Sequence, residues 1–382
     1  MYDGSVAAGF GEQLKTRSYF LRGSARAALI AAALLCAFSR AKASEMQFFP
    51  CCVDEPGLPM EVLSLNIKRW YSRGAGMFRK SFPFPFPTSP PIPPSDISMG
   101  STLEFNGINT TLNLYSVEVR PAGWLSFEAE HGNDAFRSGT GLDHDWINSP
   151  GYDLYSPSGY VYYDPHDSDF SKSMSSLSGA TEITALRAYL RVIAYHERIE
   201  DSVAYTHFVD VFGGYVWYDD KIQMRDAVQV DEPDPFLNAV YGLPPPGPYP
   251  GLDSSFTFHW EGAEIGLREK CILNSVLSSE GRFGVVPAAR YVGRGSWNLR
   301  SDLLQNPSFR QTATGHAFDL SLDLTYSPVK FFAVKAGYMA YFFYAKDGVD
   351  TINFADGSTG QDHLDRAKSE RRGLFASASL KF

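Results

Sequence analysis

The sequence has no apolar run long enough to cross a membrane as a helix. Its most apolar stretch, AALIAAALLCAF at residues 27–38, has twelve residues, whereas a transmembrane helix needs ~20. Charged residues are also few, at 20% of the 382 residues, and acidic residues outnumber basic ones by 43 to 34. Proteins that bind nucleic acid neutralise phosphates with clustered Lys and Arg, so this balance argues against that class.

Aromatic residues, by contrast, are abundant. They make up 14% of the chain, with 28 Phe and 21 Tyr, and hydrophobic residues make up 44%, which excludes a long disordered protein. The 33 Gly and 24 Pro are close to average usage, so collagen-like and low-complexity classes are excluded too. This composition is typical of a β-rich surface protein or a membrane barrel.

The apolar run at residues 27–38 has the features of a secretory signal peptide. Arg22 and Arg26 precede it, and the tripeptide AKA at 41–43 follows with small residues where a signal peptidase reads them. We therefore expect cleavage after residue 43 and export of the chain. The other interpretation is a buried helix of a cytosolic domain.

The C-terminal residues alternate between apolar and polar side chains, as a strand with one apolar face does. The apolar face would carry Leu374, Ala376, Ala378, Leu380 and Phe382, and the polar face Ser377, Ser379 and Lys381. A terminal Phe that closes such a strand resembles the assembly signal of outer-membrane barrels.

The same alternation recurs inside the chain, at residues 318–326 and 186–192. In a transmembrane barrel the apolar face contacts lipid and the polar face lines the lumen. The polar row at 186–192 contains Arg187, Tyr189 and Arg191, which suits a polar lumen better than the exterior of a soluble sandwich.

These patterns predict an all-β fold, a ten-stranded antiparallel transmembrane β-barrel with long extracellular loops. Bacterial barrels have an even number of strands, as predicted here. The expected strands are at 98–105, 108–119, 122–131, 180–194, 203–219, 254–267, 282–297, 312–326, 330–345 and 370–382.

The lengths of the predicted connections support this topology. With the N-terminus in the periplasm, the long loops at 132–179, 220–253 and 346–369 all fall outside the cell, and the tight turns fall inside. Asn106-Gly107, a two-residue hairpin signal, is the one short connection predicted outside. The 220–253 loop is acidic and would attract cationic peptides.

Three domains follow: a signal peptide at 1–43, a periplasmic N-terminal segment at 44–97, and the outer-membrane barrel at 98–382. The N-terminal segment contains a proline-rich run at 82–94, which would act as a stiff spacer or as a docking motif. The topology places Cys271 on the periplasmic side, so a disulfide from Cys271 to Cys51 or Cys52 is a hypothesis.

The first predicted outside loop carries two carboxylates, Asp143 and Asp145, within the run LDHDW at 142–146. Two neighbouring carboxyl groups can share a proton and activate a water molecule. They could also bind Ca²⁺, although the run lacks the further oxygen ligands of a calcium loop. A solvated acidic turn is the third interpretation.

The run LDHDW resembles the Asp-x-Asp-Trp motif of the omptins, which are ten-stranded outer-membrane aspartate-type proteases. Residues 96–100 and 293–297 resemble the family's first-strand opening and the end of its seventh strand. The resemblance extends over roughly residues 96–382. It implies that Asp143 and Asp145 face an Asp-x-His couple across an extracellular groove, and that a water molecule between the couples attacks the peptide carbonyl.

The loop expected to supply that couple has no histidine. Aligned on Pro307, it places Asp302 at the family's aspartate and Leu304 at its histidine; aligned on Trp297, it places Leu304 and Asn306 there. Neither alignment provides an imidazole, the usual general base. His316, at the start of the predicted eighth strand, could act as a displaced base, as could His131 or His144.

Four functions therefore remain open at this point. The first is a non-proteolytic surface barrel of omptin-like fold that contacts outer-membrane lipid, lipopolysaccharide or cationic peptides. The second is an active omptin-like endopeptidase that uses Asp143, Asp145 and Asp302, with His316 as the possible base. The third is a small outer-membrane channel, and the fourth a soluble secreted sandwich. No cofactor, metal or nucleic acid is expected.

Overall fold

The computed structural model divides the chain into two compact units, Met1–Phe48 and Phe49–Phe382. Of the first unit it describes only the short strand β1 (Gln47–Phe48). In the second unit it describes residues 62–83, 98–148, 152–156, 159–163, 168–199, 203–230 and 245–382. The expected signal peptide, most of the proline-rich run, Cys51 and Cys52 lie outside these ranges. No helix in the described part of the chain is long and apolar enough to span a membrane.

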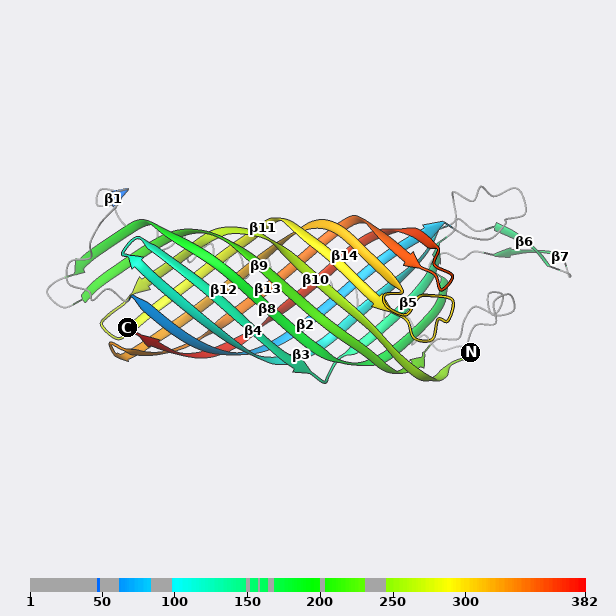
Figure 1. Cartoon of the computed structure of the whole chain (residues 1–382), viewed down its shortest axis with the longest axis horizontal. Helices are drawn as coiled ribbons and strands as arrows, with labels where there is room; N and C mark the ends of the chain where they lie inside the picture. The colour runs from blue at the N-terminus through cyan, green and yellow to red at the C-terminus, as the bar shows by residue number, and fades with distance from the viewer. Residues whose placement is uncertain are drawn as a thin grey trace, which may run out of the picture. The chain divides into compact units, whose positions relative to one another are not determined.

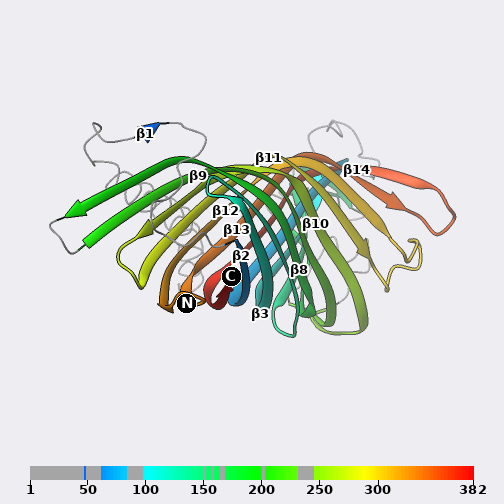
Figure 2. The same ribbon diagram turned by 60° about the vertical axis from the view of Figure 1, so that its left-hand side comes forward.

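The second unit is a closed antiparallel β-barrel (Figures 1 and 2), whose sheet returns on itself because β2 pairs with β14 and β8 pairs with β9. A separate hairpin is made of β6 (Tyr152–Ser156) and β7 (Gly159–Tyr163). The barrel strands are β2 (Leu63–Pro83), β3 (Ser98–Ala122), β4 (Leu125–Phe136), β5 (Thr140–Asn148), β8 (Ser168–Ile199), β9 (Val203–Gln229), β10 (Gly247–Ile272), β11 (Leu277–Ser296), β12 (Phe309–Val329), β13 (Phe332–Asn353) and β14 (Thr359–Lys381).

The all-β antiparallel barrel predicted from the sequence is confirmed, but the second unit contributes the eleven strands given above to it, and the predicted count of ten is not confirmed. One source of the difference is the pair β4 and β5. These two strands follow one another, separated by residues 137–139, between the same neighbours β3 and β8.

The barrel also begins earlier than predicted. Residues 63–83 were expected in a periplasmic segment, yet they form β2 and pair with β14 and β3 along their length. The sequence of β2 lacks a clear alternation because each face carries both apolar and charged side chains. The inward row combines Trp70 with Lys68, and the outward row combines Ile67 with Arg69.

The hairpin predicted at Asn106-Gly107 is wrong, because both residues lie in the middle of β3. The register of β3 against β2 shifts between Gly74 and Gly76, opposite this dipeptide, and Gly107 has a φ of 66°. The dipeptide therefore forms a β-bulge. A bulge of this type and a tight hairpin both use a glycine with positive φ, so the local signal is the same.

With that hairpin removed, long and short connections separate completely between the two ends of the barrel. The short ones are residues 123–124, 200–202, 273–276 and 330–331. The longer ones are residues 84–97, 149–167, 230–246, 297–308 and 354–358, and we call the end of the barrel where they connect the strands the mouth. Several predicted loop residues belong to strands instead, since β9 continues to Gln229 and β13 to Asn353.

An exposed apolar belt surrounds the outer face near the end with the short connections. Its outward side chains include those predicted at 186–192, 318–326 and the C-terminus: Leu65, Ile67, Tyr71, Tyr115, Val117, Phe127, Leu186, Leu190, Val211, Ile265, Leu267, Phe283, Phe318, Leu322, Leu324, Tyr326, Val334, Leu374 and Leu380. A membrane takes up ~9–11 residues of a tilted strand. Because β8 has 32 residues and β3 has 25, the strands extend well beyond the belt, toward the mouth.

The lumen is filled with side chains. Ion pairs lie inside it at the level of the belt: Lys68 with Glu130 at 2.8 Å, Arg187 with Glu264 at 2.8 Å, and Arg268 with Glu118 at 3.1 Å. Nearer the mouth it holds aromatic rings in contact with one another, among them Phe256, Phe258, Trp260 and Tyr291. The predicted inward row is confirmed for Arg187 and Tyr189, which are both buried.

Candidate functional site at the mouth of the barrel

The two carboxylates singled out in the sequence lie on a strand, not in a loop. Asp143 and Asp145 belong to β5 and, being two residues apart, both face the lumen. Their neighbour across β3 is Ser101, which pairs with Asp145 and donates a hydrogen bond from Oγ to Asp143 Oδ1 at 3.3 Å. The strand therefore brings both carboxylates to the inner wall just below the mouth.

Packing on the outer face holds β5 against β3. Trp146 stacks beneath the Arg79 guanidinium, which lies 4.2 Å from the ring centroid. Its ring covers Gly100, where an added Cβ would lie 2.2 Å from the indole. The tryptophan of the Asp-x-Asp-Trp run thus packs against a glycine, and this contact positions the two aspartates on the opposite face.

The carboxylate pair resists full ionisation. Burial, together with the charge of Asp145, raises the pKa of Asp143 to about 8. Burial also raises the pKa of Asp145, against the opposing effects of Ser101 and Lys80. Two like charges this close cannot both form easily, so the pair holds a proton at neutral pH.

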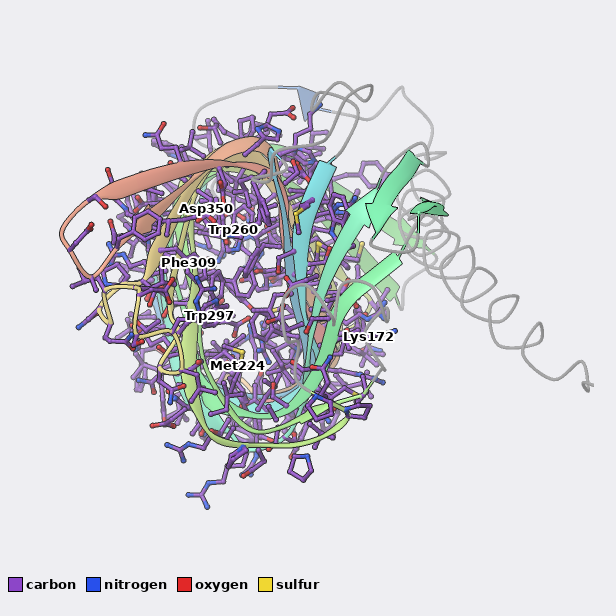
Figure 3. The ribbon with its side chains drawn as sticks, turned by 90° about the vertical axis from the view of Figure 1, so that its right-hand side faces the viewer. Lys172, Met224, Trp260, Trp297, Phe309 and Asp350 are labelled. Carbon is purple, nitrogen blue, oxygen red and sulfur yellow. The ribbon has the colours of Figure 1, made fainter. Side chains whose placement is uncertain are left out.

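A lysine and two further aspartates extend this site across the lumen. Lys80 Nζ on β2 lies 2.9 Å from Asp350 Oδ2 on β13 and 3.4 Å from Asp362 Oδ2 on β14. Burial opposes the charge on Lys80, but the two carboxylates outweigh it and raise the lysine's pKa. Figure 3 looks into the barrel from the mouth and shows Asp350 inside the ring of strands.

These three residues were missed in the sequence because of where the strands were thought to end. Lys80 was placed before the barrel, and both aspartates were placed in the predicted loop at 346–369. With them, the site contains four carboxyl groups and one ammonium group, so it is acidic overall.

The position expected to carry the second catalytic couple is occupied by an ion pair. Asp302 accepts two hydrogen bonds from Arg300, to Oδ1 at 2.7 Å and to Oδ2 at 2.6 Å. This bond with Arg300 lowers the pKa of Asp302. Leu304 is exposed and offers no proton acceptor. The carboxylate of Asp302 is therefore engaged by a guanidinium, where the omptin arrangement has a histidine.

The histidines proposed as displaced bases face away from the lumen. His316 is exposed on the outer face of β12, with its ring 5.4 Å from that of Tyr344. His131, also exposed, bonds Thr184 Oγ1 at 2.9 Å. His144 lies between the two aspartates and so points to the opposite face of β5. The structure brings Asp143 and Asp145 together, and the imidazole of His144 lies near enough for its charge to act on Asp145, but on the other face of β5.

A second polar surface, not predicted from the sequence, lies on the outside of the barrel at the upper edge of the apolar belt. It is a shallow depression of about 860 Å³ over β14, β2, β3 and the end of β4. Its charged lining residues are four arginines, Arg69, Arg73, Arg137 and Arg372, and one carboxylate, Asp134, beside the exposed ring of Tyr71. We call this surface the arginine groove.

Among solved structures, the barrel is similar to the outer membrane protease OmpT from Escherichia coli. The match has a TM-score of 0.61 and 8% sequence identity, and it covers 87% of this chain and 100% of that chain. The barrel is similar in fold to an omptin. At this identity the likeness concerns the fold alone. A FadL homologue from Pseudomonas aeruginosa also matches, with 11% identity over 84% of this chain and 90% of that chain, but its TM-score of 0.25 carries no argument.

The sequence comparisons are narrower. Residues 222–372 match the model of a family described as "Pom: Protochlamydia outer membrane protein". No curated protein matches the chain. The apolar belt, the omptin-like fold and this match together support the prediction that the chain is an outer-membrane β-barrel protein. The resemblance to omptins that begins with the run LDHDW is confirmed at the level of fold.

Proposed function

We propose that this protein is a surface-exposed outer-membrane barrel that binds cationic groups at its mouth and does not cleave peptides. One observation carries the proposal. The paired carboxyls of Asp143 and Asp145 face the lumen, whereas Asp302 is held by Arg300 and the candidate imidazoles point outward. A peptidase of the omptin kind needs a base that accepts a proton from the attacking water.

Cationic groups fit this site because its charge is unbalanced. Lys80 is paired with Asp350 and Asp362, and Arg300 with Asp302. Lys80, Arg300 and His144 act on the carboxyl pair only through the longer-range effect of their charge. A lysine or arginine side chain of a peptide would form an ion pair with Asp143 and Asp145. It would displace the proton that these two carboxyl groups share. Charge-assisted hydrogen bonds to carboxylates are about twice as strong as neutral ones.

The partner on the outer face would be a phosphorylated glycolipid such as lipopolysaccharide. The arginine groove lies at the height where the apolar belt ends, which is the level of lipid headgroups. Guanidinium groups bind phosphate in a bidentate manner, and tyrosine rings such as Tyr71 favour the membrane interface.

The second candidate function is an endopeptidase with a displaced base. The specific observation in its favour is that the pKa of Asp143 is raised to about 8 beside a second carboxyl, as in enzymes where two aspartates share a proton. A channel is not proposed, because ion pairs and aromatic rings fill the described lumen.

The test uses the refolded barrel with added lipopolysaccharide, after heat-modifiable gel migration has established folding. A fluorogenic dibasic peptide measures cleavage, and a labelled, uncleavable dibasic peptide measures binding by anisotropy. We expect binding without cleavage, weakened by about tenfold or more in Asp143→Asn with Asp145→Asn. Asp356→Asn is the matched control, since that carboxylate lies at the same end and bonds only Ser358 in its own turn. Cleavage that is lost in the double variant would establish the peptidase instead.

A further inference from the structure

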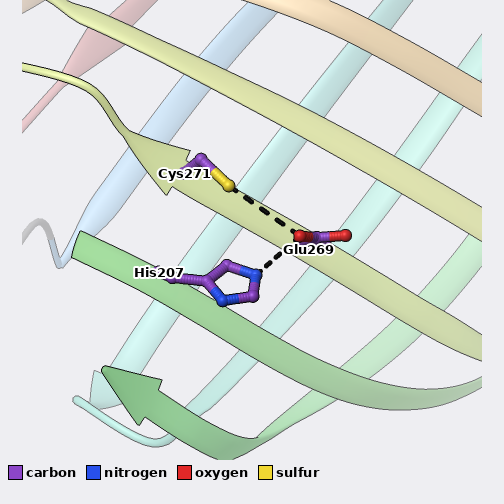
Figure 4. Close-up of side chains that lie close together, drawn as sticks. All are labelled: His207, Glu269 and Cys271. Atoms are coloured by element: carbon purple, nitrogen blue, oxygen red, sulfur yellow. Dashed lines mark hydrogen bonds and ion pairs between the residues drawn. The ribbon is translucent and has the colours of Figure 1, made fainter. Parts of the chain in front are cut away.

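Three side chains of different chemistry meet at the end of the barrel opposite the mouth. His207 on β9 pairs directly with Cys271 on β10, and Glu269 lies two residues before Cys271 on the same face. His207 Nε2 lies 2.6 Å from Glu269 Oε1, and Cys271 Sγ donates to the same oxygen at 3.8 Å (Figure 4). One ligand atom from each residue lies within 4.8 Å of the other two.

The cluster lies on the outer face, just past the apolar belt. Ile265 and Leu267 are the exposed apolar residues of this row on β10, and Glu269 and Cys271 continue the row toward the short connection at 273–276. Despite its outward position the cluster is shielded: the Cys271 residue is buried, and the side chains of His207 and Glu269 are 16% and 13% exposed.

We propose that His207, Glu269 and Cys271 form a binding site for a divalent metal ion of the Zn²⁺ class. Imidazole nitrogen, carboxylate oxygen and thiolate sulfur are the three ligand types that zinc takes in proteins, and three protein ligands leave its fourth position to water. Ligands at ~2.0–2.3 Å in a tetrahedron are about 3.5 Å apart. The present spread of 4.8 Å therefore needs only small side-chain rotations.

Charge favours a metal ion over any monovalent cation at this place. On binding, the Cys271 thiol loses its proton to solvent, because the thiolate is the ligand. Thiolate and carboxylate then carry two negative charges, His207 is neutral, and a divalent ion brings the net charge to zero. Next to an apolar belt, a neutral complex avoids the cost of leaving charge in a poorly hydrated environment. The sulfur and nitrogen donors also disfavour Ca²⁺ and Mg²⁺, which prefer oxygen ligands.

The experiment uses the full chain refolded in detergent, with Co²⁺ as a spectroscopic substitute for Zn²⁺. Cys36→Ser, Cys51→Ser and Cys52→Ser together leave Cys271 as the single thiol. We expect this parent variant to bind one Co²⁺ per chain, with a sulfur-to-cobalt charge-transfer band that Zn²⁺ abolishes and Ca²⁺ does not. Adding His207→Gln should weaken binding by more than about tenfold. His131→Gln, on the outer face of β4 and away from the cluster, is the matched control and should change nothing.

A second measurement does not depend on a further substitution. In the same parent variant, Zn²⁺ should slow labelling of Cys271 by a maleimide. Co²⁺ bound without a sulfur band, or labelling unaffected by Zn²⁺ in the folded parent, would overturn the proposal and leave only a His207–Glu269 ion pair. Loss of the cobalt site in the parent, when the unsubstituted chain has one, would also overturn it, because the ligands would then include other cysteines.

Discussion

Arg371 offers the sharpest test of how the barrel is held together, because its side chain ties several strands across the lumen. On β14 and fully buried, it lies with Nη2 2.9 Å from Asp220 Oδ1 of β9, and its Nη1 donates to Ser72 Oγ of β2 at 3.1 Å. Asp220 also accepts hydrogen bonds from Tyr218 and Thr181. The group thus joins β14, β9, β8 and β2.

Arg371→Met removes the guanidinium and leaves the Asp220 carboxylate buried without its countercharge. Breaking a buried pair in this way costs about 3–5 kcal/mol. Guanidinium-induced unfolding in detergent micelles, followed by tryptophan fluorescence, measures the loss in the free energy of unfolding. The double variant with Asp220→Leu should recover much of that loss, since two apolar side chains replace the pair.

An exposed pair of similar geometry provides the control. Arg225 Nε lies 2.7 Å from Asp253 Oδ1, but the two side chains are 58% and 57% exposed. Solvent screens such a pair, so Arg225→Met should cost far less. Equal losses for the two arginine variants, or single losses that simply add in the double variant, would refute the reasoning that burial decides the effect.

Three further predictions concern the mouth and the outer face. Binding of the uncleavable dibasic peptide should tighten as the pH rises from 6 to 9, because Asp143, with its pKa of about 8, must lose its proton first; in Asp143→Asn this pH dependence should largely vanish. Arg69→Ser with Arg73→Ser should weaken lipopolysaccharide binding, measured by calorimetry, by about tenfold or more, and high salt should mimic the effect. Gly100→Ala should loosen the contact between β3 and β5, since the added Cβ would lie 2.2 Å from Trp146; faster amide exchange in β5 would report it.

Each of these three predictions would be contradicted by a particular result. Peptide affinity that falls with rising pH would mean that the carboxyl pair is not the binding group. Lipopolysaccharide binding that survives the arginine variants would place the lipid elsewhere on the barrel. Unchanged exchange in Gly100→Ala would show that Trp146 can move aside at little cost.

Sequence patterns predicted most of the fold because many strands have one face made of apolar side chains, in the belt on the outside of the barrel. The alternation at 186–192, 318–326 and the C-terminus places its apolar side chains outward as expected. The pattern fails where a strand has left the belt. β5 and residues 168–179 of β8 lie in the predicted loop, since beyond the apolar belt a strand no longer needs an apolar outer row.

The candidate site was predictable only in part, for a related reason. Asp143 and Asp145 are two residues apart, so a short motif reveals them. Lys80 meets Asp350 only because β2 and β13 both contact β14, and a contact between residues 270 positions apart leaves no local signal. The Arg300–Asp302 pair lies within one connection, but the choice of Arg300 as partner depends on how that connection folds.

The length of the strands beyond the belt has an electrostatic consequence. Along β2, Lys80 in the mouth lies nine positions beyond Tyr71, at the edge of the belt. At ~3.3 Å per residue and a tilt of ~40°, this raises Lys80 about 20 Å above Tyr71 at the edge of the belt. The Debye length at physiological ionic strength is ~8 Å, so the anionic charge of a glycolipid layer is screened before it reaches Asp143 and Asp145. The acidic mouth therefore attracts cations from solution through its own charge, independently of the charge of the membrane surface.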